Sequence, residues 1–326
     1  MTDATGEMRV LRDVRNGRRD GDGEAFGRLH GVHAAGIDEP RLIAFANALA
    51  STGVDVLTPE LTTLARYEVS ERVVSDITEL ARAWAEEQHI PAVGVIGISF
   101  AGGLSLMAAA AQGGKQPIAF VVSVGAHEDL TRVCKYYAGD AVRGPSGEPT
   151  RVAPHPYGPR VLLRKRLPGL FSTADLPLAS RALDTYLHDQ HREAKQLAAG
   201  LSPAGREVMN VLLEEQGSAT LSSWLRDECQ ARRQELLAAS PSGKLQSLQV
   251  PVLLLHGSDD PIVPSIETRY LARDVPPAVL RDVLVTDLLR HAELKERPQL
   301  GQIYRFARFV QRLLAVAGSM QAANQR

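Results

Sequence analysis

The 326-residue chain has little cysteine, almost no net charge and no recognisable export signal. Its two cysteines, Cys134 and Cys229, predict no disulfide framework, and this usage suits a reducing compartment. A net charge of −1 gives no bias towards a polyanion, which argues against nucleic acid as a partner. The first residues are polar and lack the apolar region of a signal peptide, so we expect a cytoplasmic protein.

One uncharged run, residues 92–111, meets the length criterion for a membrane-spanning helix. Glycines and serines dilute this run, and basic flanking residues are absent. Its first half is rich in β-branched residues and its second half in alanine. The run is therefore predicted to be a strand, a tight turn and a buried helix, and no membrane span is expected.

Continuously apolar segments alternate with amphipathic helical segments along most of the chain. Strands are predicted at 54–57, 93–98, 118–124, 250–255 and 279–285. Strands that are apolar throughout and alternate with helices are typical of a parallel sheet covered on both faces. The sequence therefore predicts an α/β fold with a mostly parallel sheet flanked by helices.

Two parts of the chain depart from this alternation. Residues 1–28 show little apolar periodicity and are expected to be irregular, which would truncate the N-terminal edge of the sheet. Residues 127–248 are far longer than one strand–helix connection needs, so a helical insertion is predicted there. Its helices are predicted at 177–199, 203–216 and 221–239. The core domain is then expected to comprise residues 29–126 and 249–326.

The stretch GISFA, residues 97–101, joins a predicted strand to a predicted helix. Small residues there let the backbone reverse sharply and lift Ser99 clear of the sheet, with the Phe100 N–H at the helix N-terminus. A serine nucleophile needs a base, a carboxylate that orients the base, and N–H donors for the oxyanion. Ser99 is therefore a candidate nucleophile, and the alternative is a small residue in a packed core.

Two later residues would complete such a site. Asp260 lies in HGSDDPIVP, residues 256–264, directly after an apolar strand, where a carboxylate faces the crevice at the end of a parallel sheet. His291 follows the last predicted strand. The chain order Ser99, Asp260, His291 is that of one known Ser-His-Asp triad architecture.

These motifs resemble those of the α/β-hydrolase family from about residue 29 to the C-terminus. The HGxxDxxVP pattern at 256–264 carries most of the resemblance and implies that Asp260, and not Asp259, is the triad acid. The nucleophile motif matches at Gly97 and Ser99 and departs at Ala101. The resemblance also implies a helical cap inserted after the sixth strand of that fold.

The resemblance implies a second oxyanion donor as well. In the family an H-G-x turn follows the third strand, and here HGV at 30–32 would place the backbone N–H of Val32 beside that of Phe100. The residues before that turn, GDGEAFGRLH, differ from the apolar strand found there in the family and predict no buried strand. A non-catalytic, ligand-binding homologue therefore remains an alternative.

Other polar residues offer competing interpretations. Glu128 and Asp129 follow the strand at 118–124 and are the alternative acids if Asp260 is only a turn residue. His127 is interpreted as a loop histidine and Cys134 as a buried, small apolar residue.

No metal site is expected. His188 and His191 lie one helical turn apart, but no third ligand accompanies them, so they are interpreted as part of a solvated helix face. The basic run at 164–166 is interpreted as a solvated face of the cap.

The sequence thus predicts a serine hydrolase that cleaves a carboxylic ester of a small molecule through an acyl-enzyme, with no cofactor. Acyl transfer or peptide hydrolysis by the same triad is the alternative enzymatic interpretation. The oligomeric state is not predicted.

Overall fold

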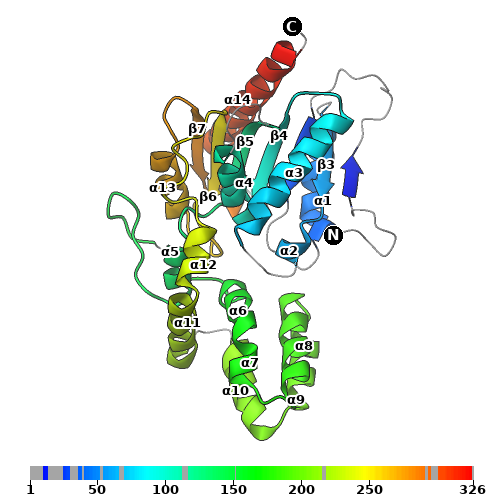
Figure 1. Ribbon diagram of the computed structural model, residues 1–326. Coiled ribbons are helices and arrows are strands. Elements are labelled where there is room, and N and C mark those ends of the chain that lie inside the picture. Colours follow the sequence, from blue (N-terminus) through cyan, green and yellow to red (C-terminus); the bar gives the residue numbers. More distant parts are fainter. Residues whose placement is uncertain are drawn as a thin grey trace.

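The computed structural model in Figure 1 describes residues 10–13, 25–29, 36–38, 40–51, 54–65, 70–111, 117–150, 152–214, 218–290, 293–294 and 300–324. Among these residues, seven strands form one sheet in the order β1-β3-β2-β4-β5-β6-β7. They are β1 (Val10–Asp13), β2 (Ala25–Leu29), β3 (Asp55–Pro59), β4 (Val93–Ile98), β5 (Ile118–Val124), β6 (Val252–Gly257) and β7 (Leu280–Thr286). A short pair, β8 (Leu289–Arg290) and β9 (Glu293–Leu294), stands apart from this sheet.

The main sheet is parallel except at one edge. β1 pairs antiparallel with β3, whereas each of the other neighbouring pairs is parallel. The helices that cover the two faces are α1 (Pro40–Ser51), α3 (Arg72–Glu87), α4 (Phe100–Ala110), α13 (Ile266–Asp274) and α14 (Leu300–Asn324). A 3₁₀ turn, η1 (Gly36–Asp38), precedes α1, and the short α2 (Thr62–Ala65) packs against η1. The predicted fold class, a mostly parallel sheet flanked by helices, is confirmed.

The apolar core lies in two layers, one on each face of the sheet. Val121 of β5 packs in a layer with Ile77 of α3, whereas its neighbour Val122 packs in the other layer with Phe309 of α14. Successive side chains of a strand point to opposite faces, so a strand covered on both faces must be apolar throughout. The apolar runs in the sequence therefore coincide with β4 and β5, and both strands have the predicted bounds.

The prediction of a strand-free N-terminal segment is wrong. β2 lies between β3 and β4, with Phe26 opposite Gly94 and Leu29 opposite Gly97, and β1 forms the edge of the sheet. The five residues AFGRL contain a glycine and an arginine and give no apolar alternation. The place of β2 is set by the backbone donors and acceptors of the strands on both sides, which need partners.

The helical insertion, residues 127–248, leaves the sheet after β5 and returns before β6 (Figure 1). Its elements are α5 (Leu130–Tyr137), α6 (Tyr157–Leu163), η2 (Arg164–Arg166), α7 (Leu167–Leu170), α8 (Leu176–Leu187), α9 (His191–Ala199), α10 (Pro203–Leu213), α11 (Ala219–Ala231) and α12 (Arg233–Ala238). The helix predicted at 177–199 is two helices, α8 and α9. Asp189 between them has φ = +61°, a left-handed conformation that a helix cannot contain.

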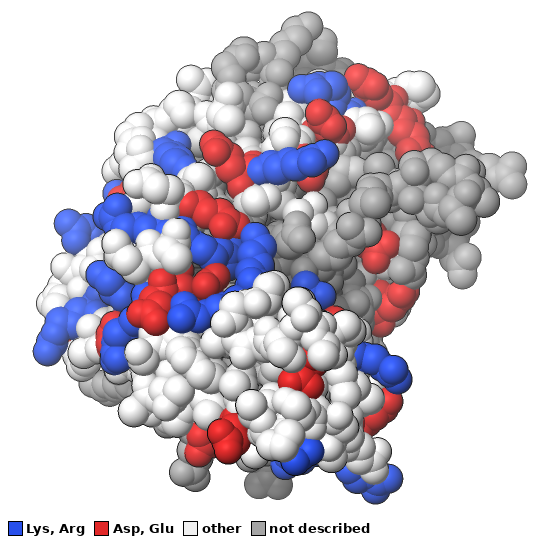
Figure 2. Space-filling model, turned by 60° about the horizontal axis from the view of Figure 1, so that its bottom comes forward, with Lys and Arg blue, Asp and Glu red and all other residues white. Residues whose placement is uncertain are grey.

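The basic run at 164–166 is partly exposed and links four helical elements. Its three side chains pair with Asp184 of α8, Glu235 of α12 and Asp227 of α11. Figure 2 shows charges of both signs interleaved over one face of the molecule, without a broad patch of one sign. Exposed pairs of this kind contribute at most about 1 kcal/mol each.

The expectation of unpaired cysteines is also wrong. Cys134 of α5 and Cys229 of α11 form a disulfide, with their Cα atoms 5.9 Å apart. The two residues are 95 positions apart in sequence, and only the packing of α11 on α5 brings them together. Because disulfides persist in oxidising compartments, cysteine usage no longer supports a reducing one.

Residues 92–111 contain β4, the turn at Ser99 and α4, as predicted. Within the described ranges, none of the helices has both the length and the apolar character that crossing a bilayer requires.

Candidate active site

Ser99 occupies the turn between β4 and α4 in a strained backbone conformation. Its φ is +57° and its ψ is −130°, outside the regions that a non-glycine residue ordinarily adopts. Its N–H donates to Val124 O at 2.7 Å, and its own carbonyl accepts from Gly102 N at 2.9 Å. Such strain persists only where the surroundings enforce it, and it clusters at functional sites.

The turn requires small residues on both sides of Ser99. A Cβ on Gly97 would lie 2.6 Å from Ala101 O and 2.6 Å from Gly102 Cα, and a Cβ on Gly102 would lie 2.8 Å from the Cβ of Ala126. Ala101 itself is fully buried, and its methyl group packs in the core. The departure from glycine at position 101 is therefore accommodated.

Asp260 follows β6 and is 1% exposed. Its Oδ1 accepts the backbone N–H groups of Ile262 at 2.8 Å and Val263 at 3.0 Å. Its Oδ2 lies 3.4 Å from His256 Nε2. The carboxylate is thus held in one orientation at the carboxyl end of the sheet.

Ser99 and Asp260 flank the same end of β5. Ser99 N is bonded to Val124 O, the last residue of that strand. The next residue, Gly125, has φ = +61°, and a Cβ there would lie 3.4 Å from Asp260 Oδ2. The structure therefore brings the predicted nucleophile and the predicted acid to neighbouring positions at one end of the sheet.

His256 supports the Asp260 turn, a role that the sequence analysis missed. Its Nε2 donates to Val263 O at 2.9 Å, so this nitrogen carries the proton, and its Nδ1 accepts from the Thr268 hydroxyl at 2.6 Å. The ring is fully buried and joins the turn to α13. The HG dipeptide that ends β6, four residues before the acid, is the sequence signal that could have indicated this role.

His291 and Val32 lie outside the described residues, so the base and the second oxyanion donor stay predictions. Phe100 is the first residue of α4, where the helix N-terminus presents its N–H groups. The Phe100 ring is buried, with its centroid 5.5 Å from that of His127.

The two alternative acids have other partners. Asp129 caps α5, because its Oδ1 accepts from both the N–H and the hydroxyl of Thr131 at 2.7 Å. Glu128 is bonded to Arg132 at 2.5 Å. These interactions favour Asp260 as the acid.

His127 lies in the loop between β5 and α5 and is fully buried. Its Nε2 donates to Ala239 O at 3.0 Å, whereas its Nδ1 has no hydrogen-bond partner in the described part of the chain. Burial lowers the pKa of His127 from 6.5 to about 4, because the interior disfavours the imidazolium.

The neutral form of His127 predicts a loss of stability in acid. The folded chain binds this proton only near pH 4, whereas the unfolded chain binds it near 6.5, so stability falls as pH drops through that window. The loss amounts to up to roughly 3 kcal/mol. The free energy of unfolding, measured with denaturant at pH 7 and pH 4.5, should show this loss in the wild type and not in His127→Gln. An identical pH dependence of the two proteins would contradict it.

A second prediction concerns Gly103, on which the His127 ring packs. A Cβ at Gly103 would lie 2.6 Å from His127 Cε1 and 2.9 Å from its carbonyl oxygen. Gly103→Ala is therefore expected to destabilise the protein by about 1–3 kcal/mol through overpacking. Gly301→Ala is the control, because a Cβ there meets no atom within 4 Å and should stabilise α14 slightly. Equal melting temperatures for the two variants would refute the close packing.

The histidines of the insertion have neighbours of their own. His188 Nδ1 lies 2.7 Å from Asp184 O, and the His191 ring stacks on that of Tyr186 with centroids 4.4 Å apart. Within the described ranges, no group of three or more His, Cys, Asp or Glu side chains is arranged to hold a metal ion.

No family model matches the chain, and no curated protein matches it. Similar solved structures include a meta-cleavage product hydrolase variant from Pseudomonas fluorescens IP01, 16% identical, covering 93% of this chain and 92% of that chain with a TM-score of 0.46. A proline iminopeptidase from Mycobacterium smegmatis is 16% identical over 94% of this chain and 95% of that chain, with a TM-score of 0.46. An enzyme from a Medee basin deep-sea metagenome library is 13% identical over 94% of each chain, with a TM-score of 0.47.

The fold can be identified from features of this chain alone, without the solved structures. They are the strand order with one antiparallel edge strand, the helices on both faces, the strained serine between β4 and α4, and the helical insertion between β5 and β6.

Proposed function

The chain has the α/β-hydrolase fold, and from its site we propose that it is a serine hydrolase of carboxylic esters. Ser99 attacks the ester carbonyl, His291 takes the serine proton and returns it to the leaving alcohol, and Asp260 orients the imidazole and stabilises its protonated form. The conformation of Ser99 beside β5, with the carboxylate of Asp260 against the same strand end, is the observation that carries the proposal.

The tetrahedral intermediate places a negative charge on the former carbonyl oxygen. In the proposal, the N–H of Phe100 donates to that oxygen from the start of α4, where the helix dipole favours negative charge, and the N–H of Val32 supplies the second bond. Water then attacks the acyl-Ser99 ester and releases the acid. Every proton is exchanged among Ser99, His291, water and the leaving group, so the proposal needs no cofactor.

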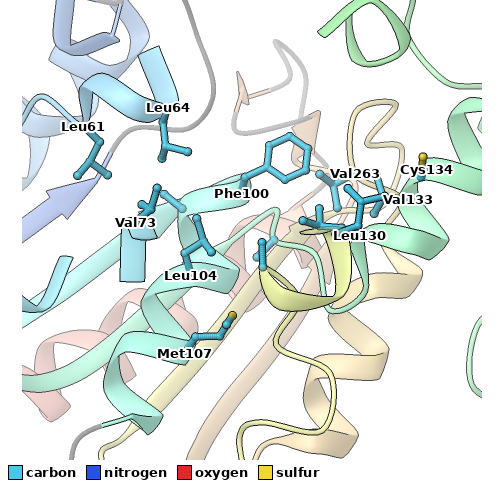
Figure 3. Packing of buried hydrophobic residues seen from close by; sticks show 14 of the residues in the cluster. Leu61, Leu64, Val73, Phe100, Leu104, Met107, Leu130, Val133, Cys134 and Val263 are labelled. Atoms are coloured by element: carbon cyan, nitrogen blue, oxygen red, sulfur yellow. The ribbon is translucent and has the colours of Figure 1, made fainter. Parts of the chain in front are cut away.

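Apolar side chains next to the nucleophile support an ester with an apolar acyl or alcohol part. In Figure 3 the Phe100 ring points toward Leu130, Val133 and Val263, and all four belong to one apolar cluster. The first two of these neighbours come from the insertion, so the proposal gives the insertion the role of a cap over the substrate. A small-molecule ester is therefore the proposed substrate class.

Hydrolysis of p-nitrophenyl acetate and butyrate tests the proposal. The purified chain is expected to release p-nitrophenolate from both, in an initial burst if breakdown of the acyl-enzyme is the slow step. Product esters formed from an added alcohol would instead indicate acyl transfer, and cleavage of peptide p-nitroanilides would indicate a peptidase. No turnover of any of these substrates would favour the non-catalytic interpretation.

A further inference from the structure

Three charged side chains meet where the insertion joins the core, and we call Glu128, Arg132 and Glu267 the junction cluster. Arg132 Nε and Nη2 donate to the two oxygens of Glu267 at 2.6 and 2.9 Å, and Nη2 also donates to Glu128 Oε2 at 2.5 Å. The Glu267 side chain is fully buried and that of Glu128 is 3% exposed. Removing one charged side chain from such a buried group leaves an uncompensated charge, which lowers the stability of the fold.

Glu267 also binds the backbone of the loop that follows β5. Its Oε2 accepts the N–H groups of Glu128 and Asp129, each at 2.9 Å. Two backbone donors and a guanidinium fork thus share one carboxylate, which fixes its position more tightly than an ion pair alone. The Arg132 guanidinium in turn lies 3.7 Å from the centroid of the Tyr270 ring, on the same helix as Glu267.

The two ends of the insertion are bonded to each other at this cluster. Leu130 N donates to Ser240 Oγ at 2.9 Å, and Ser242 N donates to Glu128 O at 3.1 Å. The segment that leaves the sheet and the segment that returns to it therefore share one anchoring point.

The first turn of α13 connects the cluster to the candidate active site. Glu267 holds the loop that begins at Gly125, the residue against which Asp260 Oδ2 lies. The adjacent Thr268 donates to His256, which is 3.4 Å from that same oxygen. One helical turn therefore fixes both the Asp260 turn and the loop that faces it.

We propose that Glu267, held by Arg132, is a positioning residue for the hydrolysis: it sets the Asp260 carboxylate against the loop after β5. The inference rests on the proposed function of Ser99 and Asp260. A displacement of about 1 Å in a catalytic constellation can lower the rate about 10²-fold, so a residue remote from the substrate can control it.

Two variants test this role. Glu267→Gln keeps the size and one acceptor oxygen but removes the charge that holds Arg132. Arg132→Lys keeps the charge but loses the planar fork and its stacking on Tyr270. The matched control is Arg269→Gln, on the same helix, which removes only an exposed pair with Glu148.

The readouts are kcat and KM for p-nitrophenyl butyrate across pH, the rate of inactivation by a fluorophosphonate, and thermal unfolding. We expect kcat to fall by about 10- to 100-fold in Glu267→Gln and less in Arg132→Lys. The acid limb of the kcat/KM profile should move to lower pH, because a misplaced Asp260 stabilises the protonated base less. A purely structural role would lower the melting temperature without moving that limb.

Folded Glu267→Gln and Arg132→Lys proteins with the wild-type pH profile and wild-type inactivation rate would overturn the inference. If Glu267→Gln does not fold, Arg132→Lys decides by the same criteria. A wild-type protein that is neither inactivated by the fluorophosphonate nor active on the ester would instead refute the proposed function. The control is expected to match the wild type in all three readouts.

Discussion

Replacing Ser99 by alanine is expected to lower kcat for p-nitrophenyl butyrate by about 10⁶-fold, the scale seen when the nucleophile of a triad is removed. The reason is geometric as well as chemical. The turn holds Ser99, a non-glycine residue, at φ = +57° between the end of β4 and the start of α4. The loss should appear in kcat, because the missing step is attack on the carbonyl.

Ser105→Ala is the matched control for this prediction. Ser105 is a buried serine on the same helix, and its hydroxyl donates to Ala101 O at 2.7 Å in the pattern of an ordinary helical serine. Its replacement removes a hydroxyl that bonds to Ala101 O and lies beside Gly97, but it leaves the Ser99 hydroxyl in place. Activity should therefore stay close to that of the wild type. Substantial ester turnover by Ser99→Ala would exclude Ser99 as the nucleophile.

Asp260→Asn is expected to lower kcat by about 10⁴-fold. The asparagine oxygen can still accept the N–H groups of Ile262 and Val263, so the turn should keep its shape. Its amide nitrogen, however, presents a donor where the base needs an acceptor. The base is then held in the wrong tautomer and cannot take the serine proton.

Asp259→Asn provides the comparison, since Asp259 is the exposed neighbour of Asp260 and shares its local sequence. We expect this variant to keep near wild-type activity. If Asp260→Asn were silent instead, Glu128 or Asp129 would become the candidate acid. The present contacts of Glu128 with Arg132 and of Asp129 with Thr131 argue against that outcome.

The strands that carry the candidate site could be predicted because each is apolar along its whole length. β4 and β5 are covered on both faces, and their sequences, VGVIGI and IAFVVSV, contain no charge that would place them elsewhere. The sequence of β2, AFGRL, has no such signal. Its position depends on two neighbouring strands whose pairing cannot be deduced from five residues.

The turn at Ser99 could be predicted for a different reason. A sharp strand-to-helix reversal needs small residues at fixed spacing, and the close approach at Gly97 and Gly102 confirms that requirement. Longer-range partners gave no comparable signal. Glu267 binds a loop 138 and 139 residues away in sequence, and the disulfide spans 95, so only the folded chain reveals them.

The most direct test of the central claim is to find which residue a fluorophosphonate modifies. The reagent reacts only with an activated serine, so the wild-type chain should gain one phosphonate group, and mass spectrometry of its peptides should place that group on Ser99. Asp260→Asn should react far more slowly. No adduct, or an adduct on another serine with Ser99 unmodified, would contradict the account.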